Sequence, residues 1–396
     1  MRLEISNREL THRKEKVKEE AARRNLDALC LFDSKQIFYL TNFSFIPTER
    51  PMALLLTGDN TFFFAPGLEE ERIKLYAHDV TLKTYPEYPG LKHPLDYLKE
   101  LFEELNLMDK TIGVDSDGAI AGFGYHGPKI SEIIPRAEIK VVPEIIKEMI
   151  MIKSSEEIEL IRESAKWGNL ALSYLKEYTK PGLTENEISL RASTEATLAM
   201  VKTFGEKDKT FKGSADSAFA GFRGQIGKYS AYPHSLTRNA IIREGDVIGT
   251  GTGPVIGGYH SELERVMIVG KPTKEQEKYF NLMCELQEIG ISAIKPGVKC
   301  SEVDNKVMKF YEDNNILKYW KHHTGHSIGL GVHEPPFLDR GDNTVIQPGM
   351  VFTVEPGIYI PEVGGFRHSD TVLVTEDGIE ILTYFPRDLK SLIIRV

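Results

Sequence analysis

The feature that most constrains this fold is a segment that occurs twice in the second half of the chain. Residues 180–188 and 295–303 both read Lys-Pro-Gly, an apolar residue, three further residues, and then Glu followed by another apolar residue. Each copy lies between two stretches of helical periodicity, and strand-rich segments follow each helix pair. The helical stretches are 154–179 and 184–204 around the first copy, and 273–294 and 301–313 around the second. This repeat predicts two structurally related halves, with a ligand cavity at their junction.

The first 150 residues have a different pattern, in which short apolar runs alternate with amphipathic stretches. The expected strands are 26–32, 52–56, 61–64, 111–114 and 139–142, and the expected helices are 8–24 and 94–105. This alternation predicts an α/β layered domain with a mixed sheet. A long helix is expected from Ser154, which precedes Glu157 with the spacing of a capping box. We therefore expect two domains, 1–150 and 151–396.

Composition and charge exclude several kinds of partner. The chain has 49 Lys and Arg against 58 Asp and Glu, and this net charge of −9 argues against a nucleic-acid binder. No window approaches the roughly 18 consecutive apolar residues of a membrane span, and the N-terminus has no apolar signal segment. The three cysteines form no Cys-x-x-Cys pair, which is typical of a reduced protein. We expect a cytoplasmic protein that acts on a small-molecule substrate, with no nucleic-acid or membrane partner.

Five short segments place polar side chains inside apolar strand contexts. They are Tyr232-Pro233-His234, residues 258–265 (GYHSELER), residues 324–336 (TGHSIGLGVHEPP), residues 352–357 (FTVEPG) and residues 365–370 (GFRHSD). In this order and spacing they resemble the pita-bread superfamily of methionine aminopeptidases, Xaa-Pro aminopeptidases, prolidases and creatinase. The resemblance implies an α+β chain, in which a C-terminal pita-bread domain with pseudo-twofold halves follows a smaller α/β domain of the creatinase N-terminal type.

The peptidases of this superfamily bind two metal ions through Asp, Asp, His, Glu and Glu. By resemblance, the second, third and fourth of these positions are Glu262, His326 and Glu355. The first falls on Gly251 and the fifth on Ser369, and neither residue has a carboxylate. Because two neighbouring cations need bridging carboxylates, we expect no dinuclear centre and no cofactor beyond at most one weakly bound divalent ion.

Creatinase itself works without metal, and the resemblance to that branch implies a set of catalytic residues. Glu264 stands in a Leu-Glu-Arg segment like that of creatinase, while His234 and His326 correspond to its two active-site histidines. Glu264 and Glu355 would hold a cationic, guanidinium-like group. His234 would act as the proton shuttle, a natural role for an imidazole near neutral pH.

A further group of residues is expected to bind the substrate. Side chains alternate along a strand, so Glu262 shares a face with Glu264 and adds negative charge. In the resemblance, Arg50 reaches the substrate carboxylate in the neighbouring subunit of a homodimer. The residues expected to bind substrate are Arg50, Glu262, His333, Arg340 and Arg367.

These observations favour a creatinase-like hydrolase that needs no metal. It would cleave a C–N bond in a small cationic or zwitterionic amidine, guanidino or N-substituted amino-acid substrate. One alternative is a metal-dependent Xaa-Pro dipeptidase or aminopeptidase with a degenerate metal site. Another is a non-catalytic pita-bread binding module, against which the joint presence of His234, His326, Glu264 and Glu355 argues. A lyase acting on a sulfonium substrate is a more distant alternative.

Overall fold

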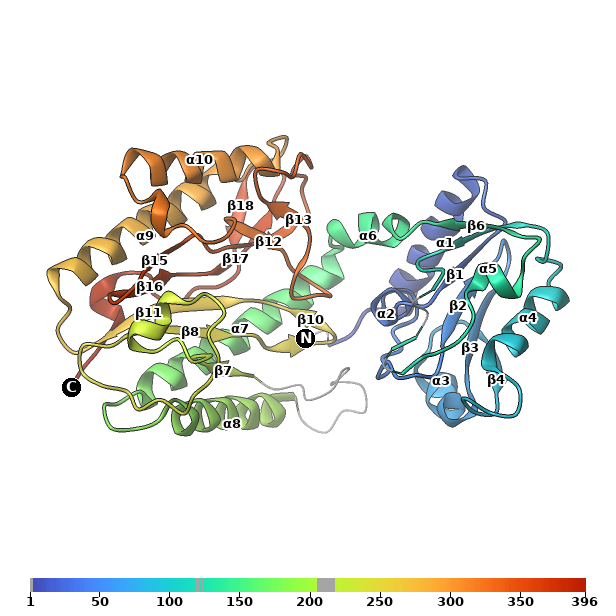
Figure 1. Cartoon of the computed structure of the whole chain (residues 1–396), viewed down its shortest axis with the longest axis horizontal. Helices are drawn as coiled ribbons and strands as arrows, with labels where there is room; N and C mark the ends of the chain where they lie inside the picture. The colour runs from blue at the N-terminus through green and yellow to red at the C-terminus, as the bar shows by residue number, and fades with distance from the viewer. Residues whose placement is uncertain (1–2, 119–120, 123, 205–217) are drawn as a thin grey trace. The chain divides into compact units, whose positions relative to one another are not determined.

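The computed structural model describes residues 3–118, 121–122, 124–204 and 218–396 (Figure 1). The described chain divides into two compact units, one of residues 4–150 and one built from residues 151–396 together with Leu3. None of the helices in the described ranges combines the length and apolar character that a bilayer crossing requires.

The smaller unit is built on a six-stranded mixed sheet with the order β4-β3-β2-β1-β5-β6. Its strands are β1 (Ala28–Leu31), β2 (Ala53–Leu56), β3 (Thr61–Pro66), β4 (Thr81–Tyr85), β5 (Thr111–Val114) and β6 (Glu138–Val141). Its helices are α1 (Asn7–Arg23), α2 (Ser34–Thr41), η1 (Gly67–Glu69), α3 (Glu70–Tyr76), α4 (Pro94–Glu104), α5 (Ile130–Ile133) and α6 (Glu144–Met151). β1 pairs antiparallel with β2 and parallel with β5, so the expected mixed sheet is confirmed.

The larger unit contains two pairs of long helices. The first pair is α7 (Ser155–Tyr178) and α8 (Glu185–Phe204), and the second is α9 (Lys274–Ala293) and α10 (Cys300–Asp313). The members of each pair lie side by side, on either side of the strands of this unit (Figure 1). α7 begins with the predicted capping box, in which the Ser154 hydroxyl accepts from the Glu157 amide and the Glu157 carboxylate accepts from the Ser154 amide.

Two main sheets lie between the helix pairs, with the orders β19-β11-β8-β7 and β13-β12-β14-β17-β18. The first contains β7 (Ala220–Gly221), β8 (Val247–Thr252), β11 (Leu263–Val269) and β19 (Ile393–Ile394). The second contains β12 (Gly325–Ser327), β13 (Glu334–Leu338), β14 (Val351–Val354), β17 (Asp370–Val374) and β18 (Ile379–Ile381). The remaining elements are η2 (Gly227–Ala231), β9 (Val255–Ile256), β10 (Tyr259–His260), η3 (Leu317–Tyr319), β15 (Gly357–Ile360), β16 (Gly364–Arg367) and η4 (Leu389–Leu392).

The two Lys-Pro-Gly turns adopt the same conformation and make the same contacts. Gly182 has φ +91° and Gly297 has φ +86°, a left-handed region that glycine enters without steric cost. The Gly182 amide donates to the Ile242 carbonyl at 3.0 Å, and the Gly297 amide donates to the Ile346 carbonyl at 2.9 Å. The predicted pseudo-twofold halves of an α+β pita-bread fold are therefore confirmed, down to individual hydrogen bonds.

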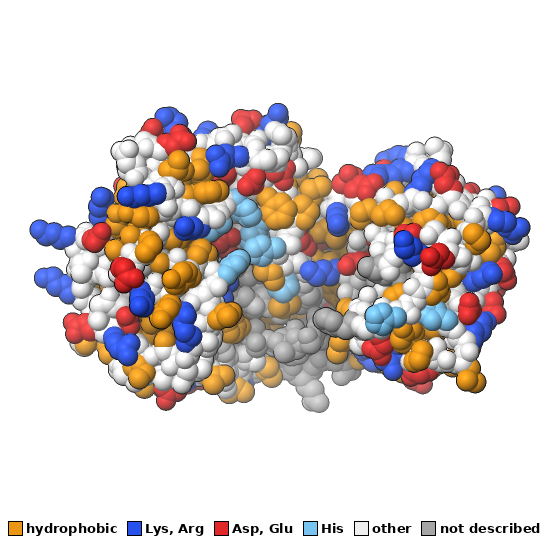
Figure 2. All heavy atoms as spheres, in the orientation of Figure 1, with side chains coloured by type: hydrophobic (Ala, Val, Ile, Leu, Met, Phe, Trp, Pro, Cys, Tyr) orange, Lys and Arg blue, Asp and Glu red, His pale blue; other side chains and the backbone are white. Residues whose placement is uncertain are grey.

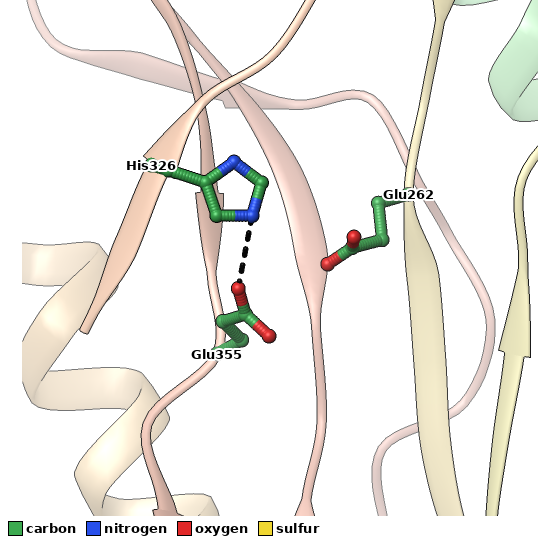
Figure 3. A group of neighbouring side chains, drawn as sticks. All are labelled: Glu262, His326 and Glu355. Atoms are coloured by element: carbon green, nitrogen blue, oxygen red, sulfur yellow. Dashed lines mark ion pairs between the residues drawn. The ribbon is translucent and has the colours of Figure 1, made fainter. Parts of the chain in front are cut away.

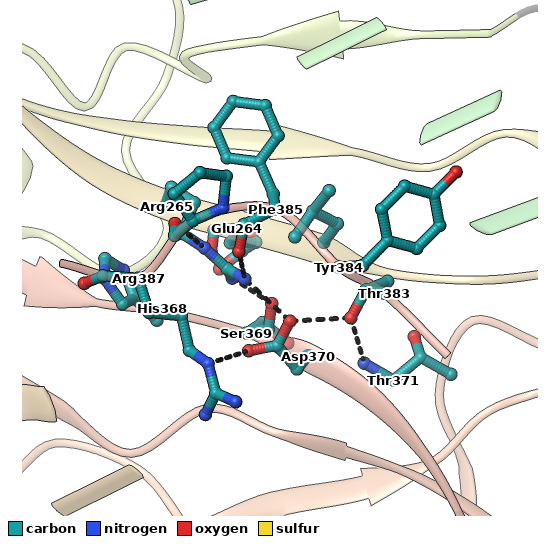
Figure 4. A network of polar contacts seen from close by, with 12 residues as sticks. Glu264, Arg265, His368, Ser369, Asp370, Thr371, Thr383, Tyr384, Phe385 and Arg387 are labelled. Atoms are coloured by element: carbon teal, nitrogen blue, oxygen red, sulfur yellow. Dashed lines mark hydrogen bonds and ion pairs between the residues drawn. The ribbon is translucent and has the colours of Figure 1, made fainter. Parts of the chain in front are cut away.

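The two halves meet where β11 approaches β17. Glu264 and Ser369 exchange backbone hydrogen bonds, each with an N–O distance of 3.0 Å. Beside this bridge the fully buried guanidinium of Arg265 donates to the Asp370 carboxylate at 2.8 Å and to the Ser369 carbonyl at 2.9 Å (Figure 4). It also donates to two backbone carbonyls of the segment 385–386. Removing one member of such a buried pair typically costs about 3–5 kcal/mol, so the junction is firmly held.

Candidate active site

Three donor side chains converge at the junction of the two halves (Figure 3). Glu262 lies directly before β11, His326 lies in β12, and Glu355 directly follows β14. One ligand atom from each residue lies within 4.8 Å of the other two, and His326 Nε2 is 3.1 Å from Glu355 Oε1. Because the three residues come from different strands of two sheets, the fold itself fixes their mutual distances.

The hydrogen bonding of His326 fixes which ring nitrogen carries the proton. Its Nδ1 lies 3.0 Å from the Ser327 carbonyl oxygen, which can only accept, so Nδ1 carries the hydrogen. In the neutral ring the lone pair is then on Nε2, a buried atom that has no hydrogen-bond partner although Glu355 Oε1 is close. Two acceptors that face each other in this way need a cation between them. Metal-binding histidines commonly donate their other N–H to a carbonyl in this manner.

Burial and mutual repulsion perturb the protonation of these side chains. Burial, followed by the charges of Glu355 and Glu264, raises the pKa of Glu262 to about 8. Burial opposes protonation of His326, but the carboxylates of Glu355 and Glu262 outweigh it and raise the pKa to about 9. For Glu355 the burial penalty is outweighed by His326 and Arg367, which hold its pKa well below the usual range. A positive charge among these groups is therefore favoured, whether it is a proton or a metal ion.

The two superfamily ligand positions without a carboxylate have particular neighbours in this chain. Gly251 is the cross-strand partner of Glu264, and a Cβ added at Gly251 would lie 3.2 Å from Glu264 Oε1. The Glu264 carboxylate thus fills the space beside Gly251. The hydroxyl of Ser369 donates to Glu262 Oε1 at 2.7 Å, so it orients one of the three donors. A carboxylate is therefore kept near the first position, but it comes from the opposite strand.

Glu264 is neutralised by two arginines. Arg367, which is 9 % exposed, places Nη2 2.5 Å from Glu264 Oε2 and Nε 3.7 Å from Glu355 Oε2. Its Nη1 also donates to the Tyr359 hydroxyl at 3.3 Å. Arg223 places Nη2 3.2 Å from Glu264 Oε1. The predicted Glu264 and Arg367 are therefore brought together with the three donors, although as an internal ion pair.

Histidines surround the same point, and in Figure 2 histidine side chains of the larger unit gather on the visible face. The ring of His333 stacks on that of His326, with centroids 3.7 Å apart and planes at 20°. Burial, followed by the charge of His326, lowers the pKa of His333, and His234 contributes to this lowering. His234 is exposed and follows η2, so the structure brings the predicted His234, His326 and His333 within electrostatic reach of one another.

The two remaining predicted arginines lie elsewhere. Arg340 is half-exposed, packs over the Trp320 ring and reaches Asp304 Oδ2 at 4.0 Å. Arg50 belongs to the smaller unit, where it pairs with Glu49 and, at 2.7 Å, with Glu87. Arg340 makes no ion pair or hydrogen bond with the three donors in the described part of the chain.

Sequence reasoning missed three residues around the site. Arg223 lies before the predicted Tyr232-Pro233-His234 segment and was not among the predicted site residues. His322 is buried and places Nε2 2.7 Å from the Tyr359 hydroxyl, and burial lowers its pKa to about 4. Burial also raises the pKa of Tyr359 to about 12. The sequence signals for the last two residues were their positions, because His322 lies two residues before the segment 324–336 and Tyr359 two residues after the segment 352–357.

Fold and site together define a hydrolase of the creatinase and prolidase superfamily. Residues 159–376 match the metallopeptidase family M24, and residues 13–152 match the creatinase/prolidase N-terminal domain. The chain belongs to metallopeptidase family M24.

Relatives and solved structures agree with this assignment. The chain is 28 % identical over 383 residues to a protein named Xaa-Pro dipeptidase from Pyrococcus horikoshii, covering 94 % of this chain and 97 % of that protein. The crystal structure of the prolidase from that organism has a TM-score of 0.77 at 26 % identity and covers 96 % of this chain and 99 % of its own. A Xaa-Pro dipeptidase structure from Bacillus anthracis has a TM-score of 0.80, also at 26 % identity, and covers 97 % and 99 %.

The expectation of a creatinase-like hydrolase that works without metal is wrong. The family is one of metallopeptidases, and the relatives bear the names of Xaa-Pro dipeptidases rather than of creatinases. The expectation of no cofactor beyond one weakly bound ion fails with it. It treated the two missing side chains, at Gly251 and Ser369, as the loss of metal chemistry. The donors that remain, Glu262, His326 and Glu355, nevertheless converge as a potential metal site.

Proposed function

We propose that this chain is a metal-dependent peptidase that cleaves Xaa-Pro dipeptides. The observation that carries the proposal is the convergence of Glu262, His326 and Glu355, whose ligand atoms all lie within 4.8 Å of one another. The names of the relatives, which are Xaa-Pro dipeptidases and prolidases, support the choice of substrate.

The donor set suits a divalent transition-metal ion. Glu262, His326 and Glu355 offer two carboxylates and one imidazole, a combination that Zn²⁺, Mn²⁺ and Co²⁺ accept. A metal ion bound there supplies Lewis-acid polarisation of the peptide carbonyl and an acidified water. The Ser369 hydroxyl and the Ser327 carbonyl hold Glu262 and His326 in orientation for that ligation.

The surrounding residues of the chain orient the substrate and move its protons. His333, stacked on His326, and the exposed His234 donate hydrogen bonds to the peptide on the side of the histidine cluster. His234 delivers the proton to the leaving imino nitrogen of proline, since an imidazole can both accept and donate a proton. Arg367 and Glu264 form an internal ion pair. Arg367 Nε also lies 3.7 Å from Glu355 Oε2, and its charge favours the ionised form of Glu355.

Further parts of the proposal concern assembly and location. Residues 1–150 and 151–396 are proposed as two domains, the first of the creatinase N-terminal type and the second carrying the chemistry. A homodimer in which Arg50 reaches the substrate of the neighbouring subunit is proposed from the resemblance alone. The three cysteines, all free, support a reducing cytoplasmic location.

The test removes metal and then restores it. Protein treated with chelator and dialysed should lose hydrolysis of alanyl-proline, and added Mn²⁺, Co²⁺ or Zn²⁺ should restore it. Calorimetric titration of the same ions should show binding that His326→Ala abolishes and that Glu288→Gln, a change at an exposed position, leaves intact. Full activity after complete metal removal would overturn the proposal.

A further inference from the structure

Lys153 is a buried lysine of the larger unit that directly precedes the capping residue of α7. None of its side-chain surface is exposed. Its Nζ donates to the Ser327 hydroxyl at 2.9 Å and to the Met151 carbonyl at 3.4 Å, and it lies 3.7 Å from Glu334 Oε2. Desolvating an ammonium is costly, and burial lowers the pKa of Lys153 against the opposing charges of Glu334 and Glu157. The contacts of the lysine therefore have to offset that cost.

The two side chains that Lys153 holds directly follow the two stacked histidines of the site. Ser327 follows His326, and Glu334 follows His333. The Ser327 carbonyl also accepts from His326 Nδ1 at 3.0 Å. A single ammonium group is thus bound to the chain beside both rings, although 174 positions separate it from Ser327 along the sequence.

The loop of residues 328–333 joins the two histidines and contains no helix or strand. Its backbone lies against the stem of Lys153, because a Cβ added at Gly329 would be 2.7 Å from Lys153 Cε. The amide of Gly331 donates to the carboxylate of Glu334, so the ion-pair partner of the lysine also closes the loop. Lys153 and Glu334 therefore form the inner support of an irregular loop.

This support is itself fixed to the strand that precedes Glu355. The Lys153 amide donates to the Gly349 carbonyl at 2.9 Å, in the turn before β14, and Glu355 directly follows β14. His333, in contrast, is exposed, although its ring stacks on that of His326. An exposed ring on an irregular loop keeps a defined position where packing and hydrogen bonds beneath it hold the backbone.

We propose that Lys153 is a positioning residue of the active site, because it keeps the ring of His333 stacked on that of His326. It acts through Ser327 and Glu334, not by contact with the substrate. This inference rests on the proposed function, in which His333 donates a hydrogen bond to the peptide. Without the ammonium, the loop loses its inner support and His333 is expected to sample several orientations.

A double-variant cycle tests whether Lys153 acts through His333. Lys153→Met keeps the apolar stem and removes the ammonium, and His333→Ala removes the ring. Each should lower kcat/KM for alanyl-proline on the metal-loaded enzyme by about 3- to 10-fold, the usual value of one hydrogen bond. The variant with both changes should be no worse than either alone, since the lysine then has no ring to position. Losses that multiply would mean that Lys153 acts independently of His333 and would overturn the inference.

The matched control is Lys14→Met in the smaller unit. Lys14 is also buried, with 4 % of its side chain exposed, and its Nζ donates to the carbonyls of His78 and Asp79 at 3.1 and 2.7 Å. Its loss should lower stability but leave kcat/KM unchanged well below the melting temperature. An equal loss of kcat/KM in this control would overturn the role of Lys153. If Lys153→Met does not fold, Glu334→Gln replaces it in the cycle, because glutamine lacks the charge but can still accept the hydrogen bond of the loop.

A measurement without turnover separates this inference from the proposed function. Stacked rings shift each other's proton NMR signals, so the imidazole signals of His326 report the His333 ring in protein with isotope-labelled histidine. In Lys153→Met these signals should move toward their positions in His333→Ala, and in Lys14→Met they should stay. If they move but no peptide is hydrolysed, the peptidase proposal fails while the role of Lys153 stands. Signals of His326 that keep their wild-type positions in Lys153→Met would overturn that role.

Discussion

The two halves of the larger unit share one frame but carry their carboxylates on opposite strands. Gly245 and Gly349 both have φ +87°, and their amides donate to Val269 and Val374, respectively. Six residues after these turns stand Gly251 in the first half and Glu355 in the second.

The neighbouring strands, β11 in the first half and β17 in the second, show where the two halves differ in their charged side chains. In the first half Gly251 faces Glu264. In the second half Val354 faces Asp370, and the same register extended by one residue would set Glu355 across from Ser369. In the first half the carboxylate is Glu264, on the second strand of the pair, β11. In the second half it is Glu355, which directly follows the first strand of the pair, β14. A duplicated frame therefore preserves backbone geometry strictly, while the charged side chains are free to exchange places.

The largest expected effect tests this asymmetry at the two equivalent positions. Glu355→Gln removes a donor of the proposed metal site and should lower kcat/KM for alanyl-proline by about a thousandfold, the several kcal/mol that a Lewis acid contributes. Gly251→Ala should cost far less, because its Cβ would contact only Glu264, which is not one of the three donors. Kinetics and metal titration of both variants provide the measurement. Equal losses would mean that the halves contribute alike.

A second prediction concerns the ion pair that joins the halves. Arg265→Ala should lower the free energy of unfolding by about 3–5 kcal/mol, because the buried Asp370 carboxylate loses its closest cation and keeps only the more distant Arg387 at 3.9 Å. The double variant Arg265→Leu with Asp370→Leu should recover part of that loss, since no uncompensated charge remains. Denaturant unfolding of Arg265→Leu, Asp370→Leu and the double variant measures the coupling. Strict additivity would show that the pair does not join the halves energetically.

A third prediction uses the protonation of the donors that the halves share. The pKa values of Glu262 and His326 are raised to about 8 and about 9, so the stability they contribute is present below their ordinary values of 4.5 and 6.5. It is lost as pH rises through the raised values, by about 1.4 kcal/mol per proton per pH unit. Chelator-treated protein should therefore melt at a lower temperature at pH 9 than at pH 6.5.

Metal should reverse this trend, because protons and metal compete for the same atoms and metal affinity rises over the same window. Thermal unfolding with and without Mn²⁺ at the two pH values checks both statements. In Glu262→Gln the fall in the chelator-treated protein should be smaller. A melting temperature that does not change with pH in the chelator-treated wild type would contradict the assignment.

The smallest expected effect tests the two Lys-Pro-Gly turns, which have the same conformation in both halves. Gly182→Ala and Gly297→Ala introduce a Cβ with nothing within 4 Å, at φ +91° and +86°. Each should therefore cost only the strain of a left-handed alanine, about 1–2 kcal/mol, and the two costs should match. Chemical denaturation of both variants is sufficient. Costs that differ by more than a factor of two would show that the two turns are not equivalent.

Sequence was a good guide to the frame and a poor guide to the charges within it. The Lys-Pro-Gly repeat, the capping box at Ser154 and the alternating pattern of the first 150 residues follow from local backbone chemistry, so each is visible in the chain. The pairing of Glu264 with Arg223 and Arg367 depends on side chains that are distant in sequence and meet only after folding. For the same reason, the absence of two ligand side chains was a misleading sign of metal independence.

The contact between Gly251 and the Glu264 carboxylate also limits how this chain can change over time. An acidic residue gained at 251 would place its Cβ 3.2 Å from Glu264 Oε1 and its charge beside another of the same sign. A neutral residue gained at 264 would leave no carboxylate near position 251 and would remove the closest partner of Arg367. Each single step is unfavourable although the two-step exchange conserves one carboxylate. The two positions are therefore coupled, and a change at one is expected to be tolerated only together with a change at the other.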